Sequence, residues 1–272
     1  MKRILFAGTG KELPSGAFHF LQTLQPKSVC VTGLFFCPLD FEAENSASYV
    51  PIAAPYVRVQ EKEKQDLHTI KTSFSRQCEL HHIPFHLHGN EGQWDKDLFA
   101  RESRFSDLVV LSAELFAVET FGLQPNSFLY QALQSAECPV VVLPESYLPV
   151  KQLVIAYDGS KDCLFALKQF CYLLPQLTDL PAEIIYAKDE ITEDIPDLEE
   201  LRSFCRLHFS SMNFSKLHFR AASHFGDWVR GKESAMLVSG SFGRSGFSYL
   251  TKKSFADKTI QDHNMPLFIA HT

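Results

Sequence analysis

The sequence predicts an α/β protein with two tandem domains, each a five-stranded parallel sheet flanked by helices. Three observations support this class: short apolar runs alternate with amphipathic stretches, the pattern restarts near mid-chain, and one shift aligns the two halves. Buried apolar strands separated by helices form parallel βαβ units with right-handed crossovers. We therefore expect domains at residues 1–144 and 150–272, joined by a linker with a proline at each end.

The first half contains five apolar runs of the length expected for buried strands. Ile4 to Ala7 is the first, and Val29 to Phe36 follows after a helical stretch. Residues 56–81 carry many charges on one face, which is typical of a long helix beside solvent. The other strands are expected at 85–88, 107–112 and 139–143, and the other helices at 13–25 and 126–136.

The second half repeats this order. Leu153 to Tyr157 has the pattern of a buried strand, and Ser160 is a suitable N-cap for the helix that follows. Apolar residues share one face of that helix: Cys163, Leu167, Phe170, Cys171 and Leu174. Further strands are expected at 182–187, 217–220, 236–239 and 266–270, and further helices at 194–210, 224–231 and 254–263.

An ungapped shift of 127 positions aligns the ends of the two halves. The identical pairs it brings together include Ser112 with Ser239, Ser127 with Ser254, Phe128 with Phe255, and Pro139 with Pro266. A period this long indicates duplicated domains, because solenoid repeats are about 20–50 residues long. The apolar final strands, 139–143 and 266–270, are expected at sheet edges, where they would pair with another strand.

The composition excludes several classes of protein. The net charge of −6 provides no basic field for a general nucleic-acid or anionic-membrane binder. No stretch approaches the roughly 20 apolar residues of a membrane span, and the run after Lys2 and Arg3 is far too short for a signal peptide. We therefore expect a cytoplasmic protein that binds neither nucleic acid nor membrane.

The cysteines and histidines favour structural roles. The seven cysteines include no C-x-x-C pair and mostly fall in apolar stretches, which is typical of small buried residues in a reducing compartment. His86 and His88 would share one face of a short strand, but no third ligand has suitable spacing for a metal. We therefore expect an edge-strand histidine pair and no metal site.

A glycine-rich turn follows the fourth strand of the second half. It begins Gly240-Ser241-Phe242-Gly243-Arg244, and a helix is expected to begin near Ser254, after Lys253. Glycines allow close backbone approach to a ligand, and successive N–H groups with a helix N-terminus can hold an anion. The turn therefore predicts a phosphate site, although a glycine-rich turn alone is also compatible with a structural role.

Asp158 and Ser160 follow the first strand of the same half. Ligands of doubly wound sheets bind beyond the carboxyl ends of the strands, where the strand order reverses. A carboxylate there could accept hydrogen bonds from a ribose hydroxyl or an adenine amino group. The alternative is that Asp158 only caps the following helix.

Together these motifs resemble the universal stress protein family. The matching positions are Asp158, Gly240, Gly243 and Ser254. The resemblance covers both halves and implies a parallel sheet in the order 3-2-1-4-5, the adenine-nucleotide alpha-hydrolase-like fold, with bound ATP or AMP and in some cases Mg²⁺. It also implies site roles: Asp158 meets the adenine, Ala187 lines the base pocket, and residues 240–244 with Ser254 hold ribose and phosphates.

The chain departs from the family pattern in two places. Lys253 replaces a glycine, and a lysine there could clamp a phosphate or obstruct it. The first half has Ala113, Glu114 and Phe116 where the second has Gly240, Ser241 and Gly243. A carboxylate ~4 Å from a phosphate costs about 4 kcal/mol at an effective dielectric of ~20. The first domain is therefore expected to have lost its nucleotide motif and to serve as a packing partner.

These features lead to three hypotheses. The first is a stress-type regulatory protein that binds an adenine nucleotide in its second domain and has at most slow ATP hydrolysis, because no general base is evident. The second is a nucleotide-independent scaffold that acts through protein contacts. The third is an adenylyl-transferring enzyme, but the Ser-Gly-Gly-x-Asp-Ser loop of the ATP-pyrophosphatase family is missing. The resemblance also implies that the final strands, 139–143 and 266–270, pair with each other and form an internal pseudo-dimer of the two domains. A homodimer of the whole chain stays open.

Overall fold

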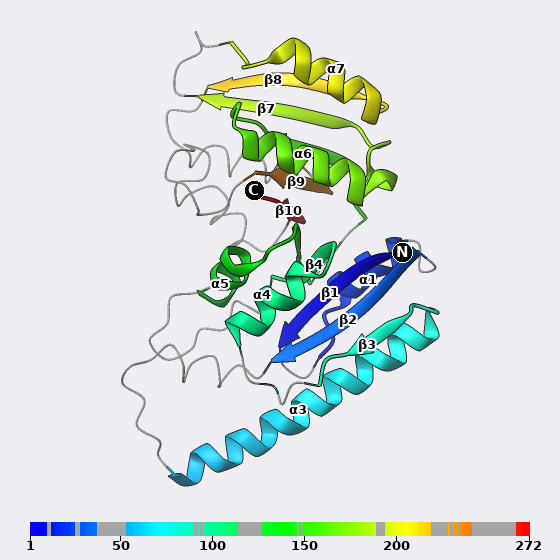
Figure 1. Ribbon diagram of the computed structural model, residues 1–272, viewed down its shortest axis with the longest axis vertical. Coiled ribbons are helices and arrows are strands. Elements are labelled where there is room, and N and C mark those ends of the chain that lie inside the picture. Colours follow the sequence, from blue (N-terminus) through cyan, green and yellow to red (C-terminus); the bar gives the residue numbers. More distant parts are fainter. Residues whose placement is uncertain are drawn as a thin grey trace. The chain divides into compact units, whose positions relative to one another are not determined.

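A computed structural model of the protein shows a chain that divides into two compact units, Met1–Cys138 and Pro139–Thr272 (Figure 1). Each unit is an α/β body of mostly parallel strands with flanking helices. The structure describes residues 1–9, 12–24, 28–36, 53–89, 92, 95–113, 127–145, 147, 149–188, 194–218, 228, 231–232, 234–240 and 265–272.

The first unit contains a parallel sheet in the order β3-β2-β1-β4. Its strands are β1 (Lys2–Thr9), β2 (Val29–Phe36), β3 (Phe85–Leu87) and β4 (Leu108–Ser112). All of β4 and nearly all of β2 are buried, as expected of continuous apolar runs covered on both faces. The helices are α1 (Ser15–Thr23), α3 (Ala53–Leu80), α4 (Lys96–Arg104) and α5 (Ser127–Ser135).

The long helix α3 packs on β2 and β3 through one apolar stripe. Its buried residues recur every three or four positions: Leu67, Ile70, Phe74 and Cys78. The ring centroid of Phe74 lies 5.4 Å from those of both Phe6 and Phe35, which favours aromatic packing. Gly33 leaves room for these rings, because a Cβ there would lie 2.9 Å from Phe35 and from Phe74.

The second unit contains a sheet in the order β5-β10-β9-β6-β7-β8. Neighbouring strands are parallel except β5 and β10, which pair antiparallel. The series β8-β7-β6-β9-β10 has the expected order 3-2-1-4-5, and β5 makes the sheet one strand larger than expected. The strands are β5 (Val140–Leu143), β6 (Gln152–Ala156), β7 (Ala182–Lys188), β8 (Met212–His218), β9 (Ala235–Ser239) and β10 (Leu267–Ile269).

Helix α6 (Lys161–Leu173) follows β6 and packs on β9 and β10 (Figure 1). Phe170 of α6 meets Phe268 of β10 edge-on, with ring centroids 5.3 Å apart. The second unit also contains a 3-10 turn, Pro175–Leu177, and helix α7, Leu198–His208. No helix among the described residues is both long enough and apolar enough to cross a membrane.

The edge strand β8 differs from the sequence-based expectation of residues 217–220. It spans Met212–His218, and polar residues interrupt its apolar residues Met212, Phe214 and Leu217. A search for continuous apolar runs therefore misses it. The expected helix at 254–263 lies outside the described residues.

Candidate functional site

The turn between β6 and α6 is held by Asp158 and Ser160. The Ser160 backbone N–H donates to Asp158 Oδ1 at 2.8 Å, and Gly159 between them has a φ of 82°. Ser160 Oγ accepts a hydrogen bond from the Cys163 backbone N–H at 3.2 Å. Ser160 is therefore the N-cap of α6, which confirms the sequence-based prediction, and Asp158 braces the turn before the cap.

Cys163 lies in the first turn of α6 and contacts Asp158. Its Sγ donates to Asp158 Oδ1 across 2.9 Å, and the residue is 8% exposed. Burial, followed by the negative charge of Asp158 and the hydrogen bond to it, raises the pKa of the Cys163 thiol to about 12. The sulfur therefore keeps its proton at neutral pH and acts as a donor to the carboxylate.

Gly240 brings the end of β9 against the same turn. A Cβ at position 240 would lie 2.5 Å from the Cys163 backbone nitrogen and 2.7 Å from the Asp162 carbonyl carbon. Both neighbours are backbone atoms of α6, so neither can move aside without shifting the helix. A glycine is therefore required here for the close packing of the end of β9 on α6.

The structure thus brings together three of the predicted site residues, Asp158, Ser160 and Gly240. They follow β6 and β9, which pair in parallel, so both strands end at the same edge of the sheet. Ala187 lies near the end of β7, the other neighbour of β6. The remaining predicted residues lie outside the described part of the chain: Ser241, Gly243, Arg244, Lys253 and Ser254.

The loop before α7 also reaches this turn. The Tyr157 hydroxyl donates to the Pro196 carbonyl oxygen at 3.2 Å, and a Cβ on Gly159 would lie 2.8 Å from Pro196 Cγ. Burial and the nearby negative charges, Asp197 first among them, raise the pKa of Tyr157 to about 12. Sequence reasoning missed the contacts of Tyr157, Pro196 and Cys163, because each depends on neighbours distant in the chain or on the course of a turn.

Two carboxylates give this turn a negative character. Asp158 lies before α6 and Asp162 within its first turn, where the helix dipole favours negative charge. Thr272 Oγ1 donates to Asp162 Oδ1 at 2.6 Å. A phosphate at this turn would be repelled by both negative charges. A neutral group that donates hydrogen bonds to the carboxylates could bind there.

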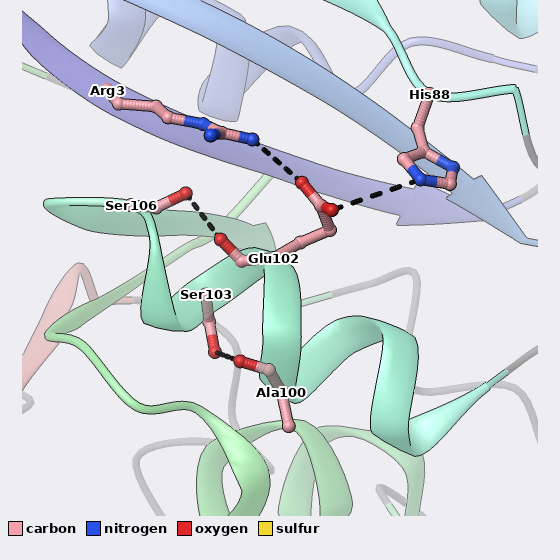
Figure 2. Close-up of polar contacts among 6 residues, drawn as sticks. All are labelled: Arg3, His88, Ala100, Glu102, Ser103 and Ser106. Atoms are coloured by element: carbon pink, nitrogen blue, oxygen red, sulfur yellow. Dashed lines mark hydrogen bonds and ion pairs between the residues drawn. The ribbon is translucent and has the colours of Figure 1, made fainter.

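His88 of the first unit lies beside the ion pair between Arg3 and Glu102 (Figure 2). Glu102 on α4 accepts from Arg3 Nη2 at 2.8 Å, and its other oxygen lies 4.0 Å from His88 Nε2. His88 follows the edge strand β3 and its backbone N–H donates to Gly33. No group of three potential metal ligands occurs among the described residues.

The described cysteines form no disulfide with one another. Burial raises the pKa of five of these thiols to about 12: Cys78, Cys138, Cys163, Cys171 and Cys205. A reactive or metal-binding cysteine requires a thiolate. These five cysteines therefore behave as protonated thiols.

Comparison with known proteins identifies the fold. No protein-family model matches the chain, and no curated protein matches it in sequence. Among solved structures, a universal stress protein from Archaeoglobus fulgidus DSM 4304 matches with a TM-score of 0.68 at 12% identity, over 98% of each chain.

Two structures from Pseudomonas aeruginosa also match. A functionally unknown protein from strain PAO1 has a TM-score of 0.55 at 10% identity and covers 100% of this chain and 92% of its own. A candidate universal stress protein from strain UCBPP-PA14 has a TM-score of 0.52 at 11% identity, over 100% and 93%. The strand order of the second unit and these full-length matches agree. This chain therefore has the universal stress protein fold.

Proposed function

We propose that the chain is a universal stress-type regulatory protein that binds an adenine nucleotide, ATP or AMP, in its second unit. One observation carries the proposal. Asp158 and Gly240, which the family resemblance assigns to the two ends of the ligand, meet on the first turn of α6. Ligands of doubly wound sheets bind at this edge, beyond the carboxyl ends of the strands.

The charges of the described residues suit one orientation of the ligand. The turn with Asp158 and Asp162 accepts hydrogen bonds and repels phosphate, so it would receive the adenine amino group or a ribose hydroxyl. Ala187, on the neighbouring strand β7, would line the base. The phosphates, with any Mg²⁺ they bring, would bind at Ser241, Gly243, Arg244, Lys253 and Ser254.

The nucleotide would act as a signal more than as a substrate. Near the described turn, the Cys163 thiol holds its proton and the Asp158 oxygen already accepts two hydrogen bonds. Neither group is poised to take a proton from water, and general bases work best with a pKa near the operating pH. We expect slow ATP hydrolysis and a cytoplasmic protein with reduced thiols.

Calorimetric titration of the purified protein with ATP and with AMP tests the proposal. The wild type should bind at least one of them, and Asp158→Asn should weaken binding about 10- to 100-fold, because a charged acceptor contributes roughly 1.5–3 kcal/mol. Asp66→Asn, a change on α3 in the first unit, should leave affinity unaltered. Absence of binding by the wild type at millimolar nucleotide would reject this function.

A scaffold that acts through protein contacts is the second candidate. The observation in its favour is that Asp158 Oδ1 is satisfied by donors from its own chain, Ser160 and Cys163. Mass spectrometry of small molecules released when the purified protein is denatured separates the two functions. A stoichiometric adenylate would reject the scaffold, whereas ligand-free protein that also fails the titration would favour it.

A further inference from the structure

Cys163 connects the three predicted site residues of the second unit that the structure brings together. Its backbone N–H donates to Ser160 Oγ, its thiol donates to Asp158 Oδ1, and its backbone lies where a Cβ on Gly240 would have to go. These contacts join the end of β6, the start of α6 and the end of β9. In sequence, Cys163 is only the first member of an apolar helix face.

The two donors to Asp158 act on one oxygen. Ser160 N–H lies 2.8 Å from Oδ1 and Cys163 Sγ lies 2.9 Å from the same atom. The first donor is backbone and belongs to the turn itself, so it would survive changes of side chain. The second is a side chain rooted in α6, and it limits rotation of the carboxylate about the Cα–Cβ and Cβ–Cγ bonds.

The chemistry of a thiol suits this role. A buried hydroxyl can accept as well as donate a hydrogen bond, and leaving its acceptor side unpaired costs free energy. A cysteine packs as a small apolar residue and can still donate a weak hydrogen bond. Cys163 is 8% exposed and lies beside apolar residues of α6, among them Ala166 and Leu167. The carboxylate acceptor strengthens an otherwise weak hydrogen bond, because hydrogen bonds to ionised groups are stronger than neutral ones.

We propose that Cys163 is a positioning residue that holds the Asp158 carboxylate in a fixed orientation for the ligand, an inference that rests on the proposed function. Affinity rises when a binding group is already oriented before the ligand arrives, because less conformational freedom is lost on binding. Cys163 itself does not contact the ligand and acts only through Asp158.

The chain provides a matched control on the same helix. Cys171 lies eight residues further along α6, is 4% exposed, and is also a free thiol. Cys163→Ala and Cys171→Ala therefore remove the same atom from similarly buried positions. Cys163→Ser is the rescue variant, because its hydroxyl can donate to Asp158 as the thiol does.

Two readouts test the inference on the full chain. In infrared difference spectra, the S–H stretching band that Cys163→Ala removes should be shifted as for a strong hydrogen bond, and Asp158→Asn should move it. By calorimetry, Cys163→Ala should weaken ATP or AMP binding about fivefold, while Cys163→Ser and Cys171→Ala stay within about twofold of wild type.

The outcomes separate this inference from the proposed function. An S–H band that Asp158→Asn leaves unmoved, or nucleotide affinity in Cys163→Ala equal to that of wild type, overturns the positioning role. Equal losses in Cys163→Ala and Cys163→Ser would indicate a packing role instead. A wild type that binds neither nucleotide overturns the proposed function, and the infrared band then still decides whether the thiol holds Asp158.

Discussion

At the scale of single residues, Gly240 is the position where the site has least freedom. The end of β9 reaches α6 so closely that backbone faces backbone, and nothing flexible lies between them. A side chain at this position has to move either the helix or the strand. The same contact holds Gly240 itself against the first turn of α6, which Asp158 precedes.

Gly240→Ala should therefore destabilise the second unit. Forcing a methyl group into a filled space costs about 1–3 kcal/mol, and the added Cβ would begin 2.5 Å from the Cys163 nitrogen. Denaturant unfolding measures the change. Gly89→Ala is the matched control, because a Cβ there has no neighbour within 4 Å. Equal stabilities of the two variants would contradict the close approach.

At the scale of elements, a partly buried polar cluster connects the strands at the edge of the second sheet. Glu183 on β7 accepts from Ser215 Oγ of β8 at 2.7 Å and from Lys232 Nζ at 2.9 Å. Lys232 also lies 4.5 Å from the ring centroid of Trp228, a cation–π distance. The segment that precedes β9 is thereby attached to β7 and β8.

This cluster predicts a pH dependence of stability. Burial alone would raise the pKa of Glu183, but hydrogen bonds from Ser215 and Lys232 and the charge of Lys232 outweigh it and lower the pKa. Because the pKa is lowered on folding, the ionised carboxylate stabilises the fold at pH values above about 4.3, the ordinary pKa of a glutamate. This stabilisation is lost as the pH falls through the lower pKa of the folded protein.

Glu183→Gln should then cost about 1–2 kcal/mol at pH 7, and its difference from wild type should shrink below about pH 4. Urea unfolding at a series of pH values measures both. Glu199→Gln is the control, because Glu199 forms only an exposed ion pair with Arg202 and such pairs contribute about 0–1 kcal/mol. If the difference in the free energy of unfolding between Glu183→Gln and wild type does not change with pH, the ionised form of Glu183 is not what stabilises the fold.

At the scale of the whole molecule, each unit has its own buried core and its own buried thiols. Cys78 lies in the first unit, and Cys171 and Cys205 lie in the second. Burial raises the pKa of all three to about 12. Their reaction with thiol reagents therefore requires the unit that contains them to open.

Thiol labelling should report the unfolding of each unit separately. With a pKa of about 12, roughly one thiol in 10⁴ is ionised at pH 8, so native protein should label very slowly at these positions. Peptide mapping after pulses of labelling in rising urea assigns each midpoint to a unit. Rapid labelling of Cys171 in native protein would contradict its burial.

The sequence was sufficient for the elements with strong local signals. Long apolar runs located β6 and β9, and the N-cap chemistry of Ser160 marked the start of α6, as the structure confirms. The charged stretch at 56–81 corresponds to α3, which spans Ala53–Leu80. It was insufficient for β8, because polar residues interrupt this edge strand and leave no continuous apolar run.

What the sequence by itself determined is the α/β class, the parallel strands and the placement of Asp158 and Gly240 just beyond two of them. Periodicity and capping are local properties, so they can be identified without knowing which elements become neighbours. The family resemblance also implied that the two final strands pair with each other, and the structure shows this as the antiparallel pair β5 and β10. Only the tertiary structure decided that β5 falls in the second unit and that Cys163 donates to Asp158. Both depend on which surfaces meet in space, and a thiol on an apolar helix face has the same sequence pattern as an ordinary core residue.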